Sequence, residues 1–221
     1  MLKEWMITLR RYFQRANSVL AKDINGKSFP KGNLIVYKLA FWGIGCVIVA
    51  FLPQGLSDGF IDYIKDIFAI FVGFFVTVLC FVFDKLDTER ILTPAEEDNV
   101  PAEQRGDSRK NVKIKQEHNY TVRFFYTIGL IILLSTLVIL LLIPNIFWKG
   151  WFNLDVRDYE FVESISGLSW SNIKLFSHLM LCVLYRIVVI VLTIKVFYFT
   201  TYSVSSLLQV LINKKKFEIW N

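Results

Sequence analysis

Cysteine, histidine and proline are scarce in this chain of 221 residues, which has three, two and five of them. Cys46, Cys80 and Cys182 all lie inside apolar runs, which excludes the loop disulfides of a secreted domain. The only histidines are His118 and His178, and neither a Cys-x-x-Cys nor an HExxH motif occurs. We therefore expect no cofactor, no metal site and no enzymatic activity.

Charge is absent from several long stretches. The longest, 124–143, has twenty residues without a charged side chain, and at ~1.5 Å per residue it covers a bilayer core of roughly 30 Å. All five prolines lie outside the predicted spans, where helices are expected to begin or end. The sequence predicts an all-α integral membrane protein with four transmembrane helices, at about 34–52, 64–84, 122–143 and 178–200.

The residues before the first span are basic and have a periodic pattern of apolar side chains. Residues 1–20 place apolar side chains, Trp5 among them, at spacings of three and four, with Arg10, Arg11 and Arg15 largely on the other side. This pattern predicts an amphipathic helix that lies on the membrane surface or packs against the bundle. We therefore divide the chain into a cytoplasmic helix and linker over 1–32 and a membrane domain over 33–221.

The lysines and arginines are distributed unevenly between the two sides of the membrane. Eighteen lie before the first span, in the middle loop or at the C-terminal end, and four lie in the other two connections. By the positive-inside rule, both ends of the chain and the loop 85–121 are cytoplasmic, the loop 144–177 is on the outer side, and the protein belongs to the inner (plasma) membrane. Because the basic residues flank spans, we expect lipid rather than nucleic acid as their partner.

The middle loop is the long polar segment of the chain. Residues 84–123 contain eight basic and nine acidic residues together with two prolines. This composition is typical of a solvated linker. It predicts either a plain connector or, together with the chain ends, a docking site for a cytosolic protein.

Arg186 is the sharpest single feature, because it lies inside the fourth predicted span. A charged group at that depth costs on the order of 3 kcal/mol, so it needs an interior partner. The nearest acid by depth is Asp66, with Asp62 one turn further out on the same helix face. We expect Arg186 to contact Asp66, within one chain or across an interface; the alternative is that its side chain reaches the outer headgroups.

Other residues near the span ends are typical of interfacial anchors. Lysines and tryptophans occur where spans meet the lipid headgroups, which is where amphipathic side chains accumulate. The expected anchors are Lys38, Lys195, Trp148, Trp151 and Trp170.

Four helices leave little room for a substrate path inside one copy, so conduction would require a homo-oligomer with a pore on its axis. The spans carry hydroxyl residues such as Ser135 and Thr193 but no acid that could form a ring. Such a pore would be hydrophobic or closed at rest.

In size and topology, the chain resembles the small four-span membrane subunits of bacterial anti-phage defence systems, such as the membrane component of the Kiwa system. The resemblance implies an oligomeric membrane sensor, anchor or effector that acts with a cytosolic partner. It includes no diagnostic motif, so it transfers no site residue. The alternatives are a homo-oligomeric channel or pore-forming effector and a small transporter subunit; a lipid-modifying or redox enzyme would need polar groups clustered at one depth.

Overall fold

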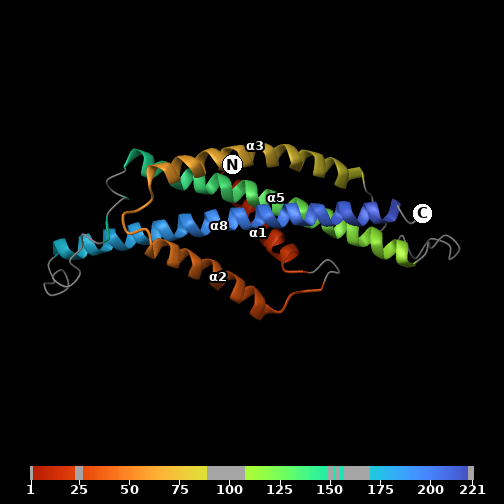
Figure 1. Ribbon diagram of the computed structural model, residues 1–221, viewed down its shortest axis with the longest axis horizontal. Helices are drawn as coiled ribbons and strands as arrows, with labels where there is room; N and C mark the ends of the chain where they lie inside the picture. The colour runs from red at the N-terminus through yellow and green to blue at the C-terminus, as the bar shows by residue number, and fades with distance from the viewer. Residues whose placement is uncertain are drawn as a thin grey trace. The chain divides into compact units, whose positions relative to one another are not determined.

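The computed structural model describes residues 2–22, 27–88, 108–148, 152, 155–156 and 170–218. Within these ranges the chain forms helices and no strand; one isolated bridge pairs Lys22 with Ser28. Figure 1 shows the helices in chain order, namely α1 (Leu2–Leu20), α2 (Lys31–Ala50), α3 (Asp58–Thr88), α5 (Ser108–Phe147) and α8 (Trp170–Glu218).

Four of these helices are long and apolar enough to cross a membrane. Their spanning segments are Lys31–Ala50, Asp58–Phe83, His118–Phe147 and Asn172–Leu208. The predicted all-helical, multi-pass membrane architecture is therefore confirmed at the level of helix number and hydropathy. The side of the membrane on which each end lies stays a prediction.

The turn between α2 and α3 is defined by its backbone. Gly55 has a φ of 100°, a left-handed conformation that glycine adopts without steric cost. The Ser57 hydroxyl then accepts a hydrogen bond from the Phe60 N–H at 3.3 Å, which is the geometry of a helix N-cap. This cap starts α3 at Asp58, earlier than the predicted span, and leaves only a short link after α2.

Helix α5 differs from the prediction at Pro144. We expected the helix to end there, but it continues to Phe147, and the Trp148 N–H donates to the Pro144 carbonyl at 2.9 Å. Proline removes only one backbone donor, so a helix tolerates it near an end when neighbours satisfy the freed groups. The Tyr185 hydroxyl donates to the carbonyl of Leu141, the residue after the one whose carbonyl Pro144 leaves without a donor, at 2.6 Å.

The contacts divide the chain into two compact units. The first unit contains residues 1–31, 74–132 and 199–221, and the second contains 32–73 and 133–198. The core of the second unit is mainly aliphatic and includes Phe68, which is fully buried and lies 5.7 Å from Phe197 between ring centroids. A Cβ at Gly45 would collide with Val191, so this glycine allows α2 and α8 to approach closely.

The first unit holds α1 against α5. Ala16 is fully buried, and the Tyr12 hydroxyl donates to the Tyr126 carbonyl at 3.1 Å. A Cβ at Gly129 would collide with the Tyr12 hydroxyl, so α5 has glycine at the point of closest approach. These contacts give α1 a packing role, and its predicted place at the membrane surface stays a prediction.

The basic residues expected on the surface of α1 have exposed side chains. These are Arg10, Arg11 and Arg15. The Trp5 side chain, expected on the apolar face, lies outside the described residues.

Candidate functional site

The largest fully buried side chain in the described ranges is that of Arg186, which is 1% exposed. It lies on α8, within the segment Asn172–Leu208 that is long and apolar enough to span a membrane. An arginine has five N–H donors and remains charged at any ordinary pH, so its burial requires acceptors close by.

Arg186 bonds to main-chain carbonyls from two connections. Its Nη1 donates to the Pro53 carbonyl and its Nη2 to the Phe152 carbonyl, both at 3.1 Å. The Pro53 carbonyl also accepts the Val156 N–H at 3.1 Å. Arg186 therefore connects α8 to the α2–α3 turn and to the segment that precedes α8.

An acidic side chain of that second connection acts on the same centre. Asp155 is the carboxylate whose charge attracts the Arg186 guanidinium. Carbonyl dipoles compensate a buried cation only in part, so a nearby carboxylate is a natural complement. We name the group formed by Arg186, Pro53, Phe152 and Asp155 the arginine centre.

Tyr185, the residue before Arg186, reinforces the arginine centre. Its ring lies 4.7 Å from the Phe152 ring between centroids, and its hydroxyl bonds to the Leu141 carbonyl of α5. The segment around Phe152 is thus held to α8 by a ring contact and by a hydrogen bond from the next side chain. Two consecutive residues of α8 therefore position three other parts of the second unit.

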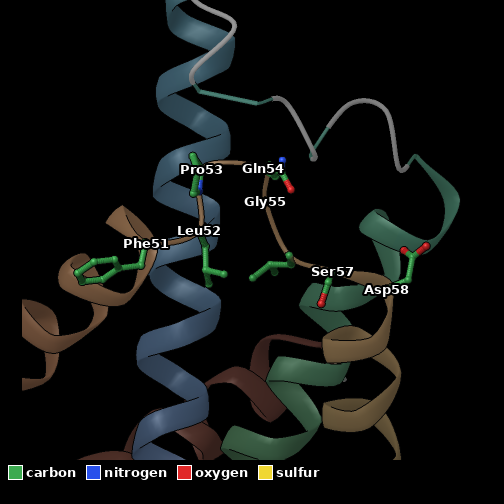
Figure 2. Close-up of a pocket in the computed structure, with 8 residues that line it drawn as sticks. Phe51, Leu52, Pro53, Gln54, Gly55, Ser57 and Asp58 are labelled. Atoms are coloured by element: carbon green, nitrogen blue, oxygen red, sulfur yellow. The ribbon is translucent and has the colours of Figure 1, made fainter.

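An open hollow of about 530 Å³ lies beside the arginine centre and is lined by residues 51–58. Figure 2 shows Phe51 on one side of this hollow and Ser57 and Asp58 on the other, with Pro53 between them. The lining comes from a single turn and includes one charged side chain, that of Asp58. Pro53 lines the hollow and its carbonyl accepts a hydrogen bond from Arg186, so the arginine centre forms part of the wall of the hollow.

The acids predicted to partner Arg186 both lie on α3. Asp62 pairs with Lys65 at 2.9 Å, and the Asp66 side chain is exposed. The contact between Arg186 and Asp66 stays a prediction. Sequence reasoning did not single out Phe152 or Asp155, because a backbone acceptor has no residue signature and Asp155 is one of several acids in its loop.

The predicted interfacial anchors lie in different surroundings. The Lys195 ammonium lies 6.0 Å from the centroid of the Phe41 ring, whereas Lys38 and Trp148 are exposed. Trp151 and the Trp170 side chain lie outside the described residues.

A second cation contact lies in the first unit. The Arg123 guanidinium is 5.2 Å from the centroid of the Tyr202 ring, which connects α5 with α8. In the same unit, burial, with a smaller contribution from Tyr126, raises the pKa of the Tyr12 hydroxyl well above its ordinary value of about 10.

The chemistry available to these groups is that of binding and holding. In the part of the chain that the structure describes, no three His, Cys, Asp or Glu side chains come together as a metal site requires. The arginine centre can hold two connections in place and respond to their displacement. No family model matches the chain, and no curated protein and no solved structure matches it either.

Proposed function

We propose that this chain is a non-enzymatic, oligomeric component of the inner membrane that acts as a sensor, anchor or effector with a cytosolic protein. The observation that carries the proposal is the outward face of α2. The buried residues of this helix, Phe41, Gly45 and Val49, form one side. The opposite side is exposed. Its residues follow one another at alternating spacings of three and four, and they are Val36, Leu39, Gly43, Cys46 and Ala50.

That spacing is the one that lets two helices pack along a shared seam. Inside a membrane, seams of this kind favour small residues, because they let backbones approach. The half of this seam after Leu39 consists of Gly43, Cys46 and Ala50, and a Cβ at Gly43 would meet no atom within 4 Å in its own chain. A second copy packed symmetrically on this face would bring the two Cys46 residues together.

Cysteine crosslinking in native membranes tests this arrangement. A chain in which Cys80 and Cys182 are replaced by alanine keeps Cys46, which is exposed. On mild oxidation we expect a band at twice 25.8 kDa, because a symmetric seam places the paired Cβ atoms within disulfide reach of about 4 Å. Adding Gly43→Ile should abolish this band, since the new side chain fills the seam without a clash inside the chain.

Two matched controls make the result specific. Gly73→Ile introduces the same side chain at an open position on α3 and should leave the Cys46 band unchanged. A chain that keeps only Cys80, which is also exposed, should crosslink weakly. Equal crosslinking through Cys46 and Cys80, or a Cys46 band that survives Gly43→Ile, would reject the α2 seam.

The first unit supports the part of the proposal that concerns a cytosolic partner. This unit gathers α1, the start of α5 and the end of α8, and α5 begins at Ser108, before its apolar segment starts at His118. Charged sequence from 85–121 belongs to the same unit. With the ends of the chain on the cytosolic side, this unit offers the polar surface that a soluble protein would bind.

The arginine centre supports a sensing role. It ties two connections of the second unit to α8, a continuous helix from Trp170 to Glu218. A ligand or lipid change that displaced either connection would remove an acceptor from a buried cation, which biases the helix toward another arrangement. The resemblance to anti-phage defence subunits suggests a setting in which such a signal is passed to a cytosolic effector.

A homo-oligomeric channel is the second candidate, and hydroxyls buried inside the chain favour a form of it in which each copy carries its own path. The Tyr185 to Leu141 bond fixes the level of α8 against α5. Ser135 lies six residues from Leu141 and Thr193 eight residues from Tyr185, so at ~1.5 Å per residue their depths differ by only about 3 Å. Both side chains are buried, and within the described residues neither hydroxyl oxygen has a hydrogen-bond partner. Unsatisfied hydroxyls in a bundle interior are a feature of hydrated paths.

A further inference from the structure

Two lysines meet on the α2 and α8 surface of the second unit. Rings from both helices pack there: the Tyr198 centroid lies 5.3 Å from that of Tyr37 and 5.5 Å from that of Phe41. Lys38 follows Tyr37 on α2, and Lys195 lies one turn before Tyr198 on α8. The ring contacts therefore hold the two ammonium groups on neighbouring helices at a similar depth.

The two lysines carry charge of one sign. The charge of Lys38 repels that of Lys195, and Lys195 is half-buried beside the ring of Phe41. Within the described ranges, neither lysine forms an ion pair with a carboxylate. Two like charges held together at the edge of a low-dielectric region are costly unless an anion lies between them.

The membrane itself supplies such an anion. Lys38 comes seven residues after the first residue of α2, so at ~1.5 Å per residue it lies about 10 Å along the helix, within reach of the headgroups of that leaflet. Basic pockets between membrane helices bind the phosphates of anionic lipids in this way. The Phe41 ring face adds cation–π attraction that keeps Lys195 oriented.

We propose that Lys38 and Lys195, held by the Tyr37, Phe41 and Tyr198 rings, form a binding site for the phosphate of one anionic phospholipid in the leaflet where α2 begins. The lysine ammonium groups bridge the phosphate. This lipid site does not depend on which of the two proposed functions is correct, because it requires only that α2 packs against α8.

Native mass spectrometry of the purified full chain tests this site. The protein is exchanged into micelles that contain equal amounts of phosphatidylglycerol and phosphatidylcholine, and the retained lipids are counted. Wild type should retain one phosphatidylglycerol in preference to phosphatidylcholine. Lys38→Gln with Lys195→Gln should reduce that preference about 30-fold, since each of these lysines contacts the phosphate and contributes about a fivefold attraction.

Matched variants separate a site from general attraction. Lys31→Gln with Lys174→Gln removes the same charge from the same two helices and should keep the preference within about twofold. Lys38→Arg with Lys195→Arg keeps both cations and should retain the lipid. Loss of preference in the Lys31 and Lys174 variant, or its persistence in the double glutamine variant, would overturn the proposal.

A competition with free phosphate and a variant at a single lysine complete the test of the lipid site. Inorganic phosphate at millimolar concentration should leave the lipid bound; displacement would mean that the lysines bind free phosphate instead of a lipid. If the double glutamine variant fails to elute as a folded protein, Lys38→Gln alone changes one exposed side chain and should lower the preference about fivefold. Unchanged preference in that variant would also overturn the site.

Discussion

At the scale of single residues, the need of Arg186 for partners was predictable and the identity of those partners was not. A guanidinium within an apolar span must be compensated, whatever the fold. Its acceptors, the carbonyls of Pro53 and Phe152, belong to connections, and every residue has a carbonyl. A sequence pattern therefore indicates acids such as Asp66 as partners. It cannot identify carbonyl dipoles such as those of Pro53 and Phe152, because every residue has a carbonyl.

Replacing Arg186 tests whether these bonds stabilise the fold. Arg186→Met leaves two carbonyls without their charged donor, so we expect the free energy of unfolding to fall by about 3 kcal/mol, and Arg186→Lys to recover only part because an ammonium cannot span both acceptors. Thermal unfolding in detergent, followed by tryptophan fluorescence, measures the change. If the side chain merely reached the headgroups, Arg186→Met would be neutral.

Two carboxylate variants show which acid compensates the guanidinium. Asp155→Asn should lower the unfolding midpoint, because Asp155 is the acid whose charge acts on Arg186, whereas Asp66→Asn should not. The opposite order would support the contact with Asp66 that the sequence predicts. Arg11→Met, on the exposed side of α1, serves as the control for loss of a cation.

At the scale of helices, hydropathy located the spans well and placed their ends less well. The length of each stretch without charged residues can be read directly from the sequence, and it predicts four spanning helices. Helix ends depend on local acceptors and donors: the Ser57 cap starts α3 early, and α5 passes Pro144 to end at Phe147. The docking of α1 on α5 depends on the pairing of Tyr12 with Gly129, two positions far apart in the chain that no periodicity connects.

The docking of α1 should weaken in alkali. Because the Tyr12 pKa is raised in the docked state, that state keeps a proton that the undocked tyrosine releases. Docking should therefore be constant below pH about 10 and weaken as pH rises above that value. In a chain without native cysteines, we compare the labelling rate of Ala16→Cys, a fully buried position, with that of Ser18→Cys, an exposed one. The ratio of the first rate to the second should rise above this pH.

Tyr12→Phe separates this titration from general alkaline effects. The phenyl ring can pack but cannot ionise, so the ratio of the two labelling rates should no longer change above pH about 10. Loss of the bond to the Tyr126 carbonyl should raise that ratio at every pH, by up to about fivefold for a bond of about 1 kcal/mol. A pH dependence that persists in Tyr12→Phe would assign the titration to another group.

At the scale of the whole molecule, the spans α2 and α3 are 17% and 11% buried, against 33% and 44% for α5 and α8. The spans of α5 and α8 are therefore the more buried ones, and most of the α2 and α3 spans is exposed in the single chain. Hydropathy alone does not reveal this difference, because the mean hydropathy of the α3 span lies between those of the α5 and α8 spans. It is the feature that makes an oligomer through α2 a more economical interpretation than a path inside one chain.

The hydroxyls of Ser135 and Thr193 decide between the sensor and the channel. If the interior is dry, each is a buried polar group without a partner, so Ser135→Ala with Thr193→Val should raise the free energy of unfolding by about 1–2 kcal/mol. Liposomes that contain the purified chain should then leak ions no faster than empty ones. If the hydroxyls line a hydrated path, the same variant should gain no stability and should slow an ion flux that wild type supports. Ser205→Ala, at an exposed position of α8, should change neither quantity and controls for the loss of a hydroxyl.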